Sequence, residues 1–188
     1  MPSSEQVHTG RCGPHGCGRW IEKQGTMRTL GVLRFVVFGA IGFGAGVLIA
    51  GAGLLIPVGG ALGGVSLGLG LEDKSKAAIL ALLGAVGATV GVIVVFVAGS
   101  AVWDSPVKMA AVIGAVVGAS LGLAFWDWQR VVVLTVAGAA GFGLGGAIGG
   151  DSPSWLPAIG GVGGASLGAA LGYLESRKLA GEGRPRVR

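Results

Sequence analysis

The sequence predicts an all-α integral membrane protein: six glycine-rich transmembrane helices arranged as three repeated helical hairpins, with both termini cytoplasmic. The first observation is composition, because 52% of residues are hydrophobic and 12% are charged, about half the charged share of soluble domains. The second is that charges gather in short segments between long apolar runs. The third is a pair of glycine patterns that each occur three times. There are 40 Gly residues but 7 Pro and no Gly-X-Y period, which excludes a collagen-like chain.

Residues 1–27 are polar and without periodicity, and they predict a disordered cytoplasmic tail. They lack the apolar core of a signal peptide. Cys12, His15 and Cys17 could bind a soft metal, but a structural zinc site needs four ligands and this spacing matches no standard zinc finger. We therefore expect no metal site, and two cysteines do not define a disulfide framework.

The apolar run 30–71 is too long for one crossing, which needs about 20 residues. Pro57 divides it, because Pro is tolerated at a helix start and is costly inside a helix. The sequence predicts helices at 30–55 and 57–71. The second is short for a span, so its complete crossing stays open. Arg34 lies near the end of the first helix, where its side chain can reach the headgroups.

Four more helices are expected at 77–100, 106–125, 131–150 and 153–174. Charged or polar loops at 72–76 and 126–130 separate the pairs. Asp104 and Asp151 each precede Ser-Pro, a helix-start signal, and we expect them to cap the following helices. The alternative is an acidic mouth that attracts cations.

Lys and Arg set the orientation of membrane proteins because cytoplasmic loops are enriched in them. With six crossings and a cytoplasmic N-terminus, all of the 14 Lys and Arg except Lys108 lie inside. Trp126, Trp128 and Tyr173 then fall at the inner interface, and Trp103 and Trp155 at the outer one. The prediction is a multi-pass protein of the cell (inner or plasma) membrane.

Two glycine patterns define the repeat. The first is Gly-Ala-x-Gly-x-x-x-Gly, starting at Gly39, Gly84 and Gly138. The second is Gly-x-x-x-Gly-x-Ser-Leu-Gly, starting at Gly60, Gly114 and Gly160. They divide the transmembrane domain, 28–178, into hairpins 28–75, 76–130 and 131–178, followed by a basic cytoplasmic tail at 179–188.

Glycines four residues apart form one stripe along a helix, which lets neighbouring backbones approach closely. The expected packing glycines are Gly42, Gly46, Gly60, Gly64, Gly68, Gly87, Gly91, Gly114, Gly118, Gly122, Gly141, Gly145, Gly160, Gly164 and Gly168. A pore seam or sliding surface is the alternative use of such a stripe.

The repeated serines, Ser66, Ser120 and Ser166, fall at similar depth in the cytoplasmic half. They could form a ring of hydroxyls that lines a pore. The alternative is a hydroxyl bonded to a carbonyl of its own helix.

No catalytic site is evident. Gly141-x-Gly143-x-x-Gly146 matches the dinucleotide fingerprint in form, but it lies inside an apolar span with no preceding strand. The midplane of the predicted spans carries no ionisable residue, which argues against ion-coupled transport. We expect neither an enzyme nor a cofactor.

Two functions remain. The first is a structural or assembly glycine-zipper module that packs tightly or oligomerises, with the lipid bilayer and a homo-oligomer or larger membrane complex as partners. The alternative is a passive channel or facilitator for a small neutral solute, lined by the repeated serines. The net charge of +5 flanks the apolar runs, so nucleic acid is not expected as a partner.

Overall fold

The chain is all-helical in the computed structural model, which describes residues 17–50, 56–71, 73–149 and 156–182. This confirms the predicted helical class. The helices are α1 (Cys17–Ala50), α2 (Ile56–Gly70), α3 (Lys74–Ala98), α4 (Ser100–Trp103), α5 (Pro106–Leu123), α6 (Trp128–Gly149) and α7 (Leu156–Glu182). Apart from α4, a four-residue turn of helix, each is at least as long as α2, which has 15 residues.

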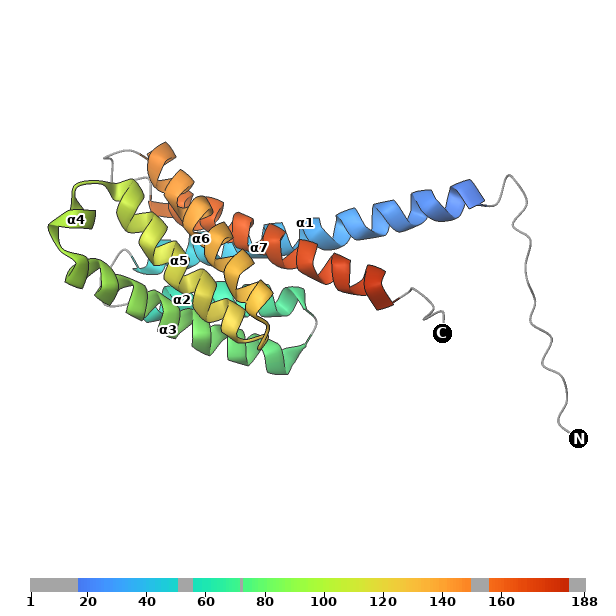
Figure 1. The fold of residues 1–188 in the computed structure, drawn as a ribbon, viewed down its shortest axis with the longest axis horizontal. Coiled ribbons are helices and arrows are strands. Elements are labelled where there is room, and N and C mark those ends of the chain that lie inside the picture. The colour runs from blue at the N-terminus through green and yellow to red at the C-terminus, as the bar shows by residue number, and fades with distance from the viewer. Residues whose placement is uncertain (1–16, 51–55, 72, 150–155, 183–188) are drawn as a thin grey trace, which may run out of the picture.

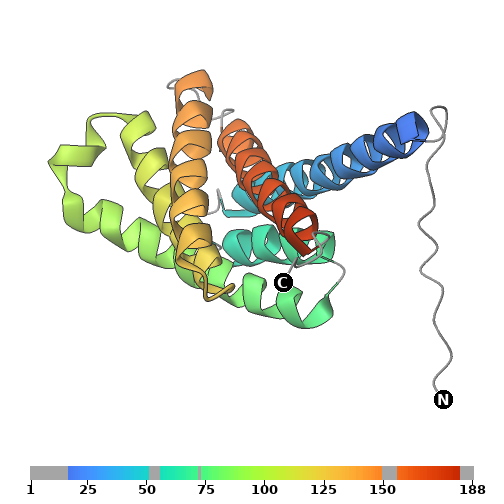
Figure 2. The same cartoon turned by 45° about the vertical axis from the view of Figure 1, so that its right-hand side comes forward.

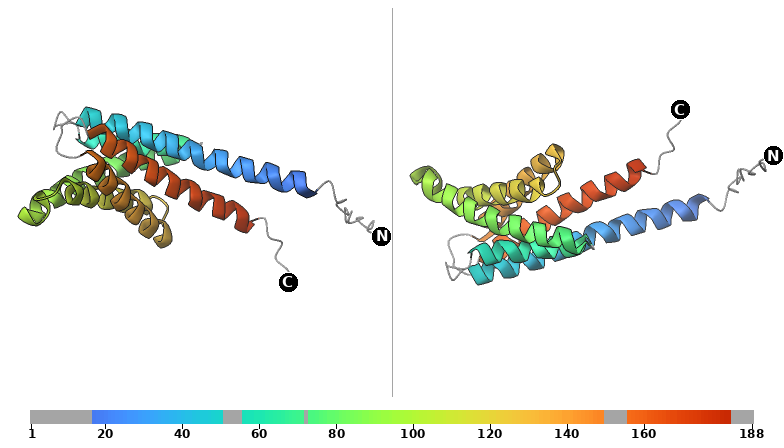
Figure 3. Two further views of the ribbon diagram at one scale, coloured as in Figure 1. Left: turned by 90° about the horizontal axis from the view of Figure 1, so that it is seen from above. Right: turned by 90° about the horizontal axis from the view of Figure 1, so that it is seen from below.

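The six long helices form a closed ring in the order α1, α2, α3, α5, α6, α7, and α7 returns to pack against α1 (Figure 1). Successive long helices run antiparallel (Figure 2). The start of α1 and the end of α7 both project from the same end of the bundle, here called the terminal end (Figure 3). The opposite end, which carries α4, is called the α4 end.

Within the described part of the chain, four helices are long and apolar enough to cross a membrane: Leu30–Ile49 within α1, Lys74–Ala98, Pro106–Leu123 and Trp128–Gly149. At 15 residues, α2 is shorter than the roughly 20 that a crossing requires. The many glycines of α7 dilute its hydropathy, and it does not qualify among the described residues. These four helices indicate a membrane protein.

The outer surface of the bundle is apolar. Val97 is 82% exposed, Ile148 70% and Leu82 66%. Soluble monomers rarely expose such contiguous apolar surface, whereas a helix in hydrocarbon requires it. Among the described residues no polar or charged side chain is buried. The bundle is therefore apolar on both its inner and outer faces.

The terminal half of the bundle has a solid interior. Its centre is filled by Leu67, Leu80, Leu121, Leu134, Leu167 and Leu171, each at most 1% exposed. We call this set the leucine core. Phe35 of α1, 8% exposed, joins the same cluster.

Two of the predicted boundaries differ from the structure. The expected tail 1–27 overlaps α1, which begins at Cys17, because the helix continues past the apolar span as a polar extension. Similarly α7 continues to Glu182, beyond the expected end of the domain at 178. A helix needs no apolar sequence outside the bilayer, so composition does not mark its end there. Residues 51–55 and 150–155, with the expected cap Asp151, lie outside the described part of the chain.

The prediction that Asp104 caps a helix is wrong. Ser105 is the N-cap residue of α5, without a side-chain cap bond. Asp104 pairs instead with Lys108 one turn into that helix, at 2.9 Å between Oδ2 and Nζ. The lysine offers the carboxylate a charged donor, which makes a stronger bond than a neutral amide.

A cap that sequence reasoning missed is Asp73 at the start of α3. Its Oδ1 accepts from the Ser75 amide at 3.0 Å and the Lys76 amide at 3.3 Å. Hydrogen bonds from the backbone amide and then the side chain of Lys76 hold the pKa of Asp73 below its usual 3.8.

Candidate functional site

All fifteen glycines expected to pack helices are buried in the bundle. They occupy two kinds of contact, which differ in the helices that they join. In the first kind, a glycine of α2, α5 or α7 faces the next long helix around the ring. In the second kind, a glycine of α1, α3 or α6 faces the helix that follows it in the chain.

The first kind brings backbones into direct contact. A Cβ placed on Gly60 would collide with the carbonyl of Gly84, and one on Gly84 with the carbonyl of Gly60. Gly114 and Gly138 collide reciprocally in the same way. The other contacts of this kind join a glycine to the backbone of a residue on the neighbouring helix: Gly39 with Gly164, Gly64 with Leu80, Gly68 with Ala77, Gly118 with Leu134, Gly122 with Val131, Gly160 with Phe43, and Gly168 with Phe35.

The second kind places each repeated serine against a glycine. Ser66 lies against Gly42, Ser120 against Gly87, and Ser166 against Gly141. In each case a Cβ on the glycine would collide with the hydroxyl oxygen. The next glycines along these helices, Gly46, Gly91 and Gly145, face Gly59, Ile113 and Ile159.

The serine hydroxyls bond to backbone carbonyls. Ser66 donates to Gly63 O, Ser120 to Val117 O and Ser166 to Gly163 O, each at 2.8 Å. Ser166 also reaches Ala137 O on α6 at 2.8 Å, so its hydroxyl bridges two helices. The structure places the three serines at the interfaces within each pair of helices, and none of them lines the cavity described below.

Gly39, Gly84 and Gly138 were not among the expected packing residues, yet they make backbone contacts as close as any. They are the first glycines of the pattern Gly-Ala-x-Gly-x-x-x-Gly. Only the second and third glycines of that pattern are four residues apart, so the spacing rule selects those two and not the first. The shared first position was the signal that could have identified these three.

A cavity of about 310 Å³ lies between the six long helices, in the half of the bundle nearest α4. Its lining residues are all apolar: Phe43, Gly46 and Val47 of α1, Ile56, Gly59 and Gly60 of α2, Ala88 and Val92 of α3, Pro106, Met109, Ala110, Ile113 and Val117 of α5, Phe142 of α6 and Ile159 of α7. The leucine core closes the bundle on its terminal side.

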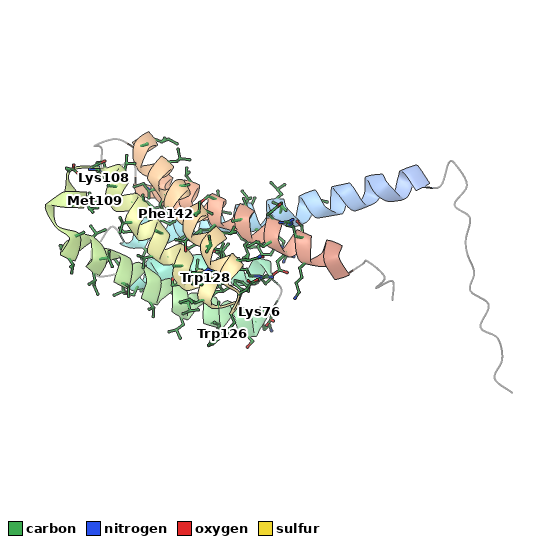
Figure 4. The ribbon with its side chains drawn as sticks, viewed as in Figure 1. Lys76, Lys108, Met109, Trp126, Trp128 and Phe142 are labelled. Carbon is green, nitrogen blue, oxygen red and sulfur yellow. The ribbon has the colours of Figure 1, made fainter. Side chains whose placement is uncertain are left out.

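Aromatic packing at the cavity differs between the helix pairs α1–α2, α3–α5 and α6–α7. Phe43 packs its ring on Gly63, and Phe142 packs on Gly163, with the two rings meeting edge to face at a centroid distance of 5.8 Å. Figure 4 labels Phe142 within the bundle. The corresponding positions in α3 and α5 hold Ala88 and Val117. A small residue on α3 thus stands where α1 and α6 each have a ring.

Charged side chains gather at the terminal end. Arg130, whose side chain is 12% exposed, bonds Glu175 of α7 at 2.7 Å and lies 3.5 Å from Asp127. Its guanidinium also stacks 4.7 Å from the ring centre of Phe125. This cluster ties the start of α6 to the end of α7.

No group of three or more potential metal ligands occurs among the described residues. Comparison with protein-family models, curated proteins and solved structures finds no match to this chain.

Proposed function

We propose that this protein is a structural module of the membrane: a six-crossing bundle whose glycine contacts lock three repeated hairpins into one ring. The observation that carries the proposal is the use of the glycines. All fifteen are buried inside one chain, and their neighbours are backbone or short side chains of adjacent helices. Such contacts gain dispersion energy and weak Cα–H···O bonds without any catalytic or transport group.

The three hairpins are α1 with α2, α3 with α5, and α6 with α7. Equivalent sequence positions make equivalent contacts in each, as the pairs Gly42–Ser66, Gly87–Ser120 and Gly141–Ser166 illustrate. Closure of the ring by α7 against α1 supports six crossings, because α7 lies beside a helix that can span.

Both termini are proposed to be cytoplasmic. The terminal end carries Lys76, Arg130 and Arg177, as the positive-inside rule requires of a cytoplasmic face. Trp126 is 99% exposed and Trp128 75% exposed at this end (Figure 4), where amphipathic rings suit the headgroup region.

Association with other proteins would use the exposed Val, Leu and Ile side chains, since the packing glycines are occupied within the chain. We therefore propose that any oligomer or larger complex forms through this apolar exterior, with the bilayer as the competing partner.

The cavity is the observation that favours a passive conduit as the second candidate. It has apolar walls, however, and the leucine core lies between it and the terminal end. The serines face their own hairpin partners. The structural role therefore has the stronger support.

Reconstitution in liposomes tests the choice. We expect the protein to pass small neutral solutes, such as glycerol and urea, no faster than empty liposomes do. Liposomes that contain a known solute channel are the positive control. Solute flux above the empty-liposome rate would replace the structural proposal with the conduit.

A further inference from the structure

Helix α5 contributes more of the cavity lining than any other helix, and its pair with α3 packs less closely than the pairs α1–α2 and α6–α7. A Cβ on Gly145 would lie 2.6 Å from the Cα of Ile159, whereas one on Gly91, at the same repeat position, would lie 3.2 Å from the Cα of Ile113. Helices α3 and α5 diverge toward α4 in both views (Figures 1 and 2).

The side chains of this hairpin add to the space. Ala88 stands where Phe43 and Phe142 supply a ring, although Val117 in place of glycine offsets much of that loss, and Ala110 is another small lining residue on α5. A volume of about 310 Å³ falls at the lower end of the usual range for ligand pockets, roughly 300–1,000 Å³. It is about twice the size of an engineered apolar cavity, roughly 150 Å³, that binds benzene.

The lining selects an apolar occupant. A buried water needs two to four polar partners, and none of the described residues that line the cavity carries a polar side chain. Without an occupant, the apolar side chains that line this space would lack dispersion contacts on the side that faces it. A flexible hydrocarbon chain restores those contacts without leaving a polar group unpaired.

The bilayer supplies such chains at the wall where the packing is loosest. Beside the divergent ends of α3 and α5, Phe96 is 65% exposed, Val97 82% and Val107 37%. These side chains would meet the acyl chains of surrounding lipids. We propose that the cavity binds one acyl chain of a bilayer phospholipid, which enters between α3 and α5.

The test uses the full-length protein in nanodiscs made of phosphatidylcholine with a diazirine in one acyl chain. After illumination, peptide mass spectrometry compares lipid adducts at the cavity residues Met109 and Ile113 with adducts at Ile79. Ile79 is 47% exposed on the outside of α3 and serves as the internal reference for lipid-facing sites.

The cavity is filled by Ala88→Leu with Ala110→Leu. The matched control is Ala78→Leu with Ala140→Leu, which makes the same chemical change at two exposed positions of α3 and α6. We expect labelling of Met109 and Ile113 in the wild type and the control, and its loss in the filled variant, with labelling of Ile79 unchanged in all three.

Absence of cavity labelling in the wild type would overturn the proposal, and so would labelling that persists in a folded filled variant. Circular dichroism and gel filtration establish folding. Should the double substitution fail to fold, Ile113→Phe fills the cavity from α5 alone, and loss of the Met109 adduct is then the expected result.

Discussion

Gly164 and Gly161 lie one turn apart on α7 and should respond to alanine in opposite ways. A Cβ on Gly164 would collide with the carbonyl oxygen of Gly39. The same Cβ would lie 2.6 Å from the carbonyl carbon of Gly39 and 2.8 Å from the Cβ of Phe43. A Cβ on Gly161 would meet nothing within 4 Å. The two positions therefore separate the packing effect of a methyl group from its effect on helix propensity.

The magnitudes follow from these contacts. Overpacking costs up to about 3 kcal/mol, and the upper value applies because the obstacle at Gly164 is backbone that no rotamer change can move. Alanine favours the helix by about 1 kcal/mol relative to glycine, which offsets part of the overpacking cost. We expect Gly164→Ala to lower the free energy of unfolding by about 2 kcal/mol, and Gly161→Ala to raise it by about 1 kcal/mol.

The assay is unfolding by SDS titration in mixed micelles, followed by circular dichroism, for wild type and both variants. In thermal melts the same energies correspond to about 2–4 °C per kcal/mol for a chain of this length. Equal effects of the two substitutions would refute the reasoning, because close contact between α1 and α7 would then not depend on a missing side chain.

Three other perturbations follow from named contacts. Serine-to-alanine changes at 66, 120 and 166 should each cost less than about 1 kcal/mol in the same titration, with Ser166 the most sensitive because its hydroxyl bridges to α6; equal costs would contradict the bridge. Arg130→Gln should cost about 2 kcal/mol by loss of its charged bond to Glu175, whereas exposed Arg177→Gln should change stability by less than about 0.5 kcal/mol; a double-mutant cycle with Glu175→Gln checks the pairing. Because the folded-state pKa of Asp73 is lowered, its cap stabilises α3 above about pH 3.8 and this contribution disappears as the pH falls through the lowered value; melts of wild type and Asp73→Ala should converge at acid pH, and a constant difference would contradict the cap.

The sequence was sufficient for the helical class and for most helix positions. Pro57 and Pro106 marked helix starts that lie within one residue of α2 and α5 in the structure. Proline is informative because its missing amide and fixed φ are tolerated chiefly in the first turn. The polar ends of α1 and α7 were missed, because outside the bilayer a helix carries no apolar signature.

Which surface each glycine faces was beyond sequence reasoning. The spacing by four places Gly60, Gly64 and Gly68 on one stripe, but it does not say which neighbouring helix that stripe contacts. Asp104 illustrates a local competition between two kinds of donor. The backbone amides at the start of α5 and the ammonium group of Lys108 are both close, and the carboxylate pairs with the charged group.

The cavity is an intermediate case. Comparison of the glycine patterns shows Ala88 where two phenylalanines stand and Val117 where two glycines stand, so the sequence contained a hint that this pair of helices packs differently. It contained no hint that Met109 and Ile113 would line the space, because the divergence of α3 and α5 is a property of the packed bundle.

Cysteine labelling across the membrane tests the central proposal of six crossings with cytoplasmic termini. In a background with Cys12 and Cys17 replaced by Ser, single cysteines are placed at Ser75, Ser105, Ser152 and Ser176, and intact cells are treated with a membrane-impermeant maleimide. We predict labelling from outside at 105 and 152, and at 75 and 176 only after the cells are opened. Labelling from outside at 75 or 176, or protection of 105 or 152, would contradict the six-crossing topology.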